Sequence, residues 1–161
     1  KYAFVLHTVN PQNNNEDEIY GELVCGLGEA LVGNFSGRAL SFKTSKKDLG
    51  KPTVVGYPSK SKGLFMETDT LIFRSDSNGE DLEGFAGAGL YDSITMEEAT
   101  LKNVDYSTDN IITDESKRER LLSTISKVAL EIETLLGSAQ DIEGAIAEDG
   151  TLWVVQTRPQ V

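Results

Sequence analysis

The C-terminal segment between Gln140 and Gln160 constrains the fold more than any other part of this chain. It consists of two runs in which apolar and polar residues alternate, the first starting at Gln140 and the second at Trp153, joined by Glu148-Asp149-Gly150. An Asp-Gly pair between two alternating runs is a strong signal for a β-hairpin. The segment therefore predicts two antiparallel strands connected by a tight turn.

Polar residues of this hairpin are expected to share one face of the sheet. Alternation along the second strand divides its residues between the two faces. One face receives Trp153, Val155 and Thr157, and the other receives Val154, Gln156 and Arg158. The first strand adds Asp141 and Glu143 to the side of Gln156. Carboxylate and amide oxygens bind hard cations, and arginine binds phosphate through a fork of donors. The spacing alone fits either a magnesium-polyphosphate site or a polar face that meets water.

The composition limits the classes of protein and partner. The chain has 161 residues, enough for one globular domain, and its 39% hydrophobic and 25% charged residues are ordinary for a soluble protein. A net charge of −11 argues against a nucleic-acid or anionic-membrane surface, which needs basic residues. No segment has the roughly 20 apolar residues of a membrane helix. The charge does not exclude ATP, because a phosphate site is local and magnesium supplies positive charge.

Two features concern the context of the chain. Its one cysteine, Cys25, cannot form an internal disulfide, and its apolar setting predicts a buried structural thiol in a reducing compartment. The chain begins at Lys1, without methionine and inside a predicted strand. We therefore expect a fragment or processed product of a longer protein.

Hydrophobic periodicity predicts an α+β fold with one long amphipathic helix. The helix spans about 114–136, with a cap at Thr113 or Asp114 and an end before Gly137. The expected strands are Lys1–Thr8, Glu18–Cys25, Arg38–Lys43, Pro52–Tyr57, Thr70–Arg74 and Thr100–Tyr106. Two stretches rich in Lys and Ser are expected to be surface loops, Thr44–Lys51 and Ser59–Gly63. No linker divides the chain, so one domain is expected.

A second candidate site is the glycine-rich segment from Arg74 to Gly89. Its glycines allow the backbone to approach a ligand closely, and successive amides could cradle a phosphate that Arg74 would pair with. The alternative is an exposed acidic loop.

Four ordered motifs resemble one branch of the phosphoenolpyruvate synthase and pyruvate phosphate dikinase family, the plant-type α-glucan, water dikinases. The motifs are Ala3-Phe4-Val5-Leu6-His7-Thr8-Val9-Asn10-Pro11, Gly26-Leu27-Gly28-Glu29, the run from Arg74 to Ser93, and Gln156-Thr157-Arg158-Pro159-Gln160-Val161. The similarity extends over the whole chain. It implies that residues 1–161 are the C-terminal portion of an ATP-grasp-type nucleotide-binding domain, with a mixed or antiparallel sheet, in a larger multidomain enzyme.

The resemblance also implies roles for individual residues. Glu143 and Gln156 would hold magnesium against the ATP phosphates, Arg158 would contact phosphate, and Asp141 would support them. Glu29 would help to shape the nucleotide pocket. The separation of Glu143 and Gln156 is one residue longer than the family usually shows, and the turn between the strands is expected to absorb the difference.

Arg74 differs in position from the wider family. Phosphoenolpyruvate synthases carry their Arg-Ser loop upstream of the first-strand motif, whereas Arg74 lies downstream of it, as in glucan, water dikinases. This placement favours the glucan branch and leaves a direct contact between Arg74 and phosphate undecided.

By resemblance, the longer enzyme passes the β-phosphate of ATP to a histidine outside this chain and then to a glucose unit of starch, and it sends the γ-phosphate to water. ATP is then a substrate, Mg²⁺ the cofactor and α-glucan the acceptor, with no nucleic-acid or membrane partner. The implied location is the chloroplast. A homodimer of the longer enzyme stays open, and this chain alone is expected to be inactive.

Two rival functions and one rival residue role are considered. Another phosphohistidine dikinase, such as a phosphoglucan, water dikinase or a phosphoenolpyruvate synthase, fits the Arg74–Ser93 motif less well. A non-catalytic glucan- or partner-binding module would need exposed aromatic side chains, and Trp153 is expected on the face opposite to Gln156. His7, the one histidine, lies in an apolar run and is interpreted as structural rather than as the phosphoryl carrier.

Overall fold

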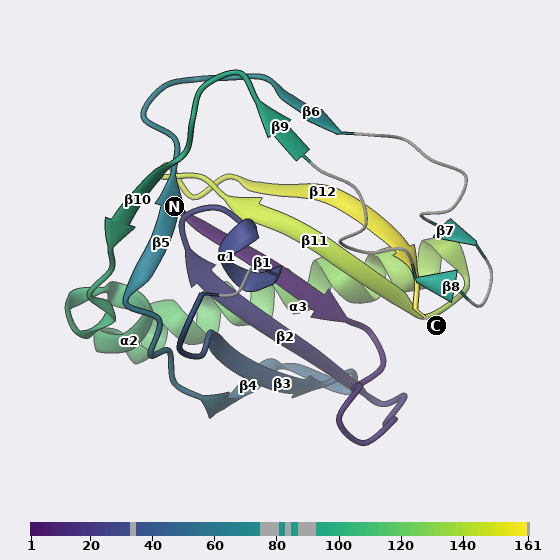
Figure 1. Cartoon of the computed structure of the whole chain (residues 1–161). Helices are drawn as coiled ribbons and strands as arrows, with labels where there is room; N and C mark the ends of the chain where they lie inside the picture. Colours follow the sequence, from purple (N-terminus) through teal and green to yellow (C-terminus); the bar gives the residue numbers. More distant parts are fainter. Residues whose placement is uncertain (33–34, 75–80, 83–84, 87–92, 161) are drawn as a thin grey trace.

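A computed structural model describes residues 1–32, 35–74, 81–82, 85–86 and 93–160. Its main element is a six-stranded antiparallel sheet with the strand order β12-β11-β1-β2-β3-β4 (Figure 1). The strands are β1 (Tyr2–His7), β2 (Glu18–Cys25), β3 (Leu40–Ser45), β4 (Asp48–Gly56), β11 (Gln140–Ile146) and β12 (Leu152–Pro159). The expected α+β class, with an antiparallel sheet and one long helix, is confirmed.

The long helix α3 (Glu115–Leu136) covers one face of this sheet, and in Figure 1 it runs behind the strands. Asp114 is its N-cap and accepts a hydrogen bond from the Lys117 amide, which satisfies one of the free donors of the first turn. Gly137 ends the helix in the left-handed conformation, at φ 74°. Both ends agree with the sequence prediction.

The core lies between α3 and the sheet. Strand alternation turns Phe4, Leu6 and Ile142 toward the helix, where they pack with Leu122 and Ile125. Gly144 is required in this layer, because a Cβ there would collide with the ring of Phe4. Among the described residues, the one-turn helix α1 (Glu29–Val32) covers part of the opposite face, where its Ala30 packs on Ala3, Val24 and Ala39.

Smaller elements surround the main sheet. Three two-stranded sheets pair β5 (Lys62–Phe65) with β10 (Thr100–Asn103), β6 (Ile72–Arg74) with β9 (Ser93–Thr95), and β7 (Asp81–Leu82) with β8 (Phe85–Ala86). The 3₁₀ helix η1 (Tyr106–Thr108) and the helix α2 (Asn110–Thr113) lead into α3.

A partly buried polar network connects this segment to the sheet. The Asp109 carboxylate, which caps α2, accepts hydrogen bonds from the Tyr2 hydroxyl and the Cys25 thiol, and the Tyr106 hydroxyl accepts one from the Cys25 amide at 2.9 Å. Burial, and then the charge of Asp109, raise the pKa of Cys25 to about 12. The prediction of a buried structural thiol is confirmed.

Three predicted boundaries are wrong. The loop expected at Thr44–Lys51 is mostly strand, because β3 extends to Ser45 and β4 begins at Asp48. Only two lysines form the turn: Lys46 pairs with Glu133 of α3, and the exposed Lys47 pairs with Asp17. These ion pairs let a polar sequence form the hairpin at the sheet edge. The loop expected at Ser59–Gly63 ends where β5 begins, at Lys62. The strand expected to reach Tyr106 stops at Asn103, where Asp105 caps η1 instead.

Truncation of Leu122 tests the packing of α3. Leu122 is 1% exposed and Leu135, on the same helix, is 82% exposed. Leu122→Ala should lower the free energy of unfolding by about 2–5 kcal/mol, because it removes buried methyl groups and leaves a cavity. Leu135→Ala, the matched control, should change it by less than about 0.5 kcal/mol. Urea unfolding measures both, and equal effects would contradict this placement of the helix.

Alkaline pH should destabilise the fold through Cys25. The folded chain holds the thiol proton up to about pH 12, whereas an unfolded thiol loses it near its ordinary value of 9.0. Since the folded state then binds more protons, the stability present below pH 9.0 should fall as pH rises toward 12. Urea midpoints at pH 8 and pH 10 measure this loss, and it should be smaller in Cys25→Ala. An identical loss in both proteins would show that Cys25 is not its source.

Candidate functional site

The polar residues of the C-terminal hairpin lie on the face of the sheet opposite α3, which we call the open face. In the pairing of β11 with β12, Asp141 stands opposite Arg158 and Glu143 opposite Gln156. Directly opposed residues project from the same face of an antiparallel pair. Alternation in β11 turns the intervening Ile142 into the core. The four side chains that the sequence placed together therefore lie on one face, away from α3.

Two sets of hydrogen bonds fix this hairpin. At its turn, Ala147 and Thr151 share a backbone hydrogen bond of 2.9 Å, Asp149 accepts from the Thr151 amide, and Gly150 adopts φ 87°. At the other end, the buried Gln140 accepts a hydrogen bond at its side-chain oxygen from the Thr157 hydroxyl, at 2.9 Å. Its backbone amide donates to the Thr8 hydroxyl, at 2.8 Å. The predicted turn at Glu148-Asp149-Gly150 is confirmed.

A β-bulge changes the assignment of faces along β12. The register shifts between Glu143 and Gly144, so that Gly144 pairs with Val154 and Val155 is the extra residue. Ala145 lies on the face of Glu143 and pairs with Trp153. The prediction that Trp153 and Gln156 lie on opposite faces is therefore wrong, as is the grouping of Val154 with Gln156. The separation of Glu143 and Gln156 is one residue longer than the family usually shows, and the sequence predicts that the turn absorbs it. In the structure, an extra residue between these two positions is Val155, which lies within strand β12.

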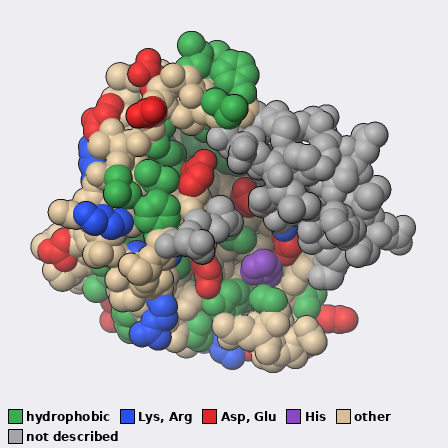
Figure 2. Space-filling view, viewed as in Figure 1, with side chains coloured by type: hydrophobic (Ala, Val, Ile, Leu, Met, Phe, Trp, Pro, Cys, Tyr) green, Lys and Arg blue, Asp and Glu red, His purple; other side chains and the backbone are tan. Residues whose placement is uncertain are grey.

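Asp141 is the centre of an ionic row that crosses three strands. His7 Nδ1 lies 2.6 Å from Asp141 Oδ1, and Arg158 Nε lies 3.6 Å from Asp141 Oδ2. The side chains of His7, Asp141 and Arg158 are 27%, 16% and 24% exposed. Figure 2 shows the single histidine, in purple, among acidic side chains on this face. The contact between His7 and the hairpin is not among the predicted features, although alternation with the buried Phe4 and Leu6 places His7 on this face.

Glu143 and Gln156 form the pair that could hold a metal ion. Gln156 Oε1 is buried and has no hydrogen-bond partner among the described residues. A buried carbonyl oxygen without a partner is costly, and it stands opposite a carboxylate in the register. This donor set fits Mg²⁺, which binds proteins through one or two oxygen ligands and keeps the rest for water and phosphate. The described residues contain no cluster of three His, Cys, Asp or Glu side chains suited to a metal.

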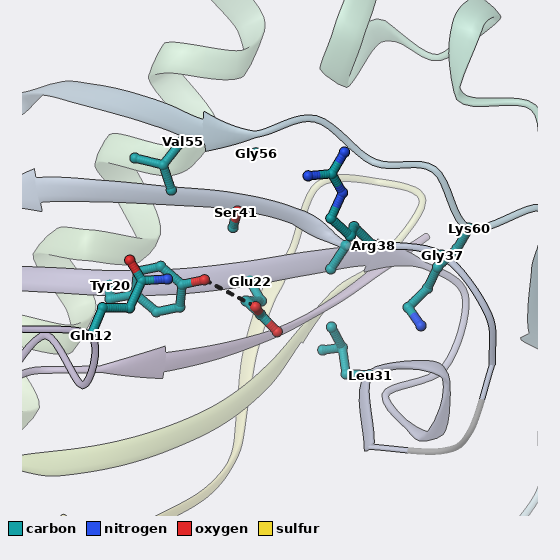
Figure 3. Close-up of a pocket in the computed structure, with 11 residues that line it drawn as sticks. Gln12, Tyr20, Glu22, Leu31, Gly37, Arg38, Ser41, Val55, Gly56 and Lys60 are labelled. Atoms are coloured by element: carbon teal, nitrogen blue, oxygen red, sulfur yellow. Dashed lines mark hydrogen bonds between the residues drawn. The ribbon is translucent and has the colours of Figure 1, made fainter.

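A cavity of about 450 Å³ lies on the same face, next to the row formed by His7, Asp141 and Arg158 (Figure 3). Glu22 of β2 lines the cavity. It is separated from Glu143 of β11 by one strand, because Val5 of β1 pairs with both residues. The Tyr20 hydroxyl donates to Glu22 Oε1 at 3.0 Å, and burial followed by the Glu22 charge raises the pKa of Tyr20. Arg38 and Lys60 line the other end. No local sequence pattern predicts this cavity, because its residues come from segments that are spread between Gln12 and Lys60.

The remaining candidate residues lie in other elements. Glu29 begins α1, and the described residues give it no hydrogen bond or ion pair with the hairpin. Arg74 ends β6, where its backbone pairs with Ser93. The predicted phosphate cradle between Arg74 and Gly89 lies mostly outside the described residues.

In the described part of the chain, none of the helices has the length and apolar composition of a membrane span.

Comparison with known proteins gives the family of this chain. Residues 1–161 match the family described as pyruvate phosphate dikinase, AMP/ATP-binding domain. The chain is 59% identical over 160 residues to the chloroplastic alpha-glucan water dikinase of Citrus reticulata, and 58% identical to that of Solanum tuberosum. Each match covers 99% of this chain and 11% of the relative.

A more distant relative is a probable phosphoenolpyruvate synthase of Pyrococcus abyssi, 27% identical over 156 residues, which are 96% of this chain and 16% of the relative. The chain thus spans about a tenth of the length of the curated relatives with the highest identity. It belongs to the pyruvate phosphate dikinase AMP/ATP-binding domain family.

Proposed function

We propose that residues 1–161 form the C-terminal portion of an ATP-grasp-type nucleotide-binding domain in a longer α-glucan, water dikinase. The reaction converts ATP, a glucan and water into AMP, a phosphoglucan and orthophosphate. The β-phosphate travels through a histidine of another domain to a glucose hydroxyl, and the γ-phosphate goes to water. The identities of 59% and 58% to glucan dikinases, against 27% to a phosphoenolpyruvate synthase, support the glucan branch.

The observation that carries this proposal is the pair of Glu143 and Gln156. The two residues are opposed in the register, and Gln156 Oε1 is buried without a partner in the described part of the chain. These two side chains would hold Mg²⁺, which when bound neutralises charge on the ATP phosphates. The fit is good because a hard cation takes oxygen ligands and leaves its other positions to the nucleotide.

Arg158 would bind and orient the phosphates beside this pair. Its Nε faces Asp141, and the described residues give its terminal nitrogens no hydrogen bond. Those nitrogens can donate to phosphate in the forked geometry that arginine favours. Asp141 would hold the guanidinium in place. Phosphoryl transfer depends mainly on positioning and charge stabilisation, so a fixed arginine contributes to both.

The proposal also gives roles to two further residues, and it names the partners and the location of the longer protein. Arg74 would belong to the phosphate-binding segment, with a direct contact to phosphate left open, and Glu29 would shape the nucleotide pocket from the start of α1. The partners of the longer protein would be ATP and α-glucan, and its location the chloroplast, the compartment in the names of the relatives at 59% and 58% identity.

Loss of the Glu143 carboxylate should abolish ATP-dependent phosphorylation of the carrier histidine in the full-length enzyme. Removing one charged ligand from a phosphate site costs on the order of 1–3 kcal/mol in binding or more, and positioning is lost as well. Glu143→Gln and Arg158→Ala should both fail in an assay with labelled ATP, with thermal unfolding nearly unchanged. Glu148→Gln, in the exposed turn of the same hairpin, is the matched control and should react normally. Near wild-type labelling of the two site variants would refute the assignment.

The isolated chain should be catalytically inactive. It lacks the carrier histidine, and the proposal assigns half of the nucleotide pocket to residues outside it. Incubation with labelled ATP and starch should release no AMP above background and leave the glucan unlabelled. Stoichiometric labelling of His7, or sustained phosphorylation of glucan, would overturn this expectation and the interpretation of His7 as a non-carrier.

A further inference from the structure

The side chain of His7 connects the N-terminal strand to the candidate phosphate site. Register places His7 opposite Asp141, and Asp141 opposite Arg158, so the three residues form one row across β1, β11 and β12. The 2.6 Å contact between His7 Nδ1 and Asp141 Oδ1 is a short hydrogen bond. Since an ionised carboxylate only accepts hydrogen bonds, His7 Nδ1 is the donor.

This hydrogen bond determines which oxygen of Asp141 is available to Arg158. A carboxylate at the surface of a strand can rotate about its last torsion, which is broad. Occupation of Oδ1 by His7 leaves Oδ2 directed toward Arg158 Nε, 3.6 Å away. An arginine that is held by a fixed carboxylate loses less conformational freedom when it binds phosphate.

The imidazole itself is held from its other side. Its ring stacks on that of Tyr20, with the centroids 6.3 Å apart and the planes at 29°. The Tyr20 hydroxyl is in turn fixed by Glu22 at 3.0 Å. His7 therefore contacts Tyr20, a residue of the cavity wall, on one side and Asp141 on the other.

We infer that His7 is a positioning residue for ATP binding, which acts by donating a hydrogen bond from Nδ1 that orients Asp141 and, through Asp141, Arg158. The inference deepens the proposed function and rests on it, because Arg158 must contact the nucleotide for its orientation to matter. In this role His7 acts through Asp141 and Arg158 rather than as the carrier of the phosphoryl group.

The test compares two substitutions of His7 in the full-length enzyme. His7→Phe keeps a ring against Tyr20 and removes the donor, whereas the side-chain amide of His7→Asn can place a donor near the position of Nδ1. Mg-ATP binding is measured by calorimetry, KM and kcat by autophosphorylation, and folding by thermal unfolding. His7→Phe should weaken ATP binding and raise KM about tenfold, as expected for one hydrogen bond to a charged group. His7→Asn should stay within about threefold of wild type.

A double-mutant cycle separates positioning from a purely structural role. Asp141→Asn should also weaken ATP binding, and His7→Phe should add little in the Asp141→Asn background, because the two residues act as one unit. A merely structural histidine would lower the unfolding temperature and kcat while leaving KM unchanged.

The possible outcomes are distinct. Equal weakening by His7→Phe and His7→Asn, additive effects in the cycle, or an unchanged KM would overturn the inference. Normal ATP binding by His7→Phe, together with weak binding by Asp141→Asn and Arg158→Ala, would overturn it and leave the proposed function standing. Normal ATP binding by Asp141→Asn and Arg158→Ala would overturn both.

Discussion

One long helix can bury only one face of a six-stranded sheet, and most of this structure follows from that constraint. Because side chains alternate with a period of two, the burial of Phe4, Leu6 and Ile142 under α3 directs Val5, His7, Asp141 and Glu143 to the other face. A slip of one residue in a strand would move that strand's apolar side chains to the other face and its polar side chains into the core. The polar row is therefore specified by the same hydrophobic packing that stabilises the domain.

Sequence patterns predicted the parts of the site that lie close together in the chain. The hairpin of Asp141, Glu143, Gln156 and Arg158 follows from alternation and an Asp-Gly turn. Trp153 was assigned to the wrong face because a bulge depends on packing between strands rather than on alternation within one. Alternation with Phe4 and Leu6 indicates the face on which His7 lies, but its partner Asp141 is 134 residues away, so the local sequence does not identify the contact. A loop is predicted at Thr44–Lys51 instead of a two-residue turn after Ser45, because lysines occur both in turns and in longer loops.

The charge of the open face bears on the form in which a nucleotide can bind. Glu22, Asp141 and Glu143 lie on the face that also carries Arg158. An uncomplexed polyphosphate would meet repulsion from these carboxylates, whereas a nucleotide that carries its own cation would meet a ligand for it. A chain with a net charge of −11 can in this way accommodate an anionic substrate, since the local arrangement matters more than the total.

The bulge at Val155 also affects how the sheet meets other polypeptides. In the described structure β12 is an outer strand, and its residues Trp153, Val154 and Val155 are exposed and apolar. Such an edge is a template for unwanted pairing with a foreign strand. An extra residue breaks the even spacing of free amide and carbonyl groups and increases the local twist. The hydrogen-bonding groups on the two sides of Val155 are then out of register for a regular foreign strand, which makes this apolar edge a poorer template for aggregation.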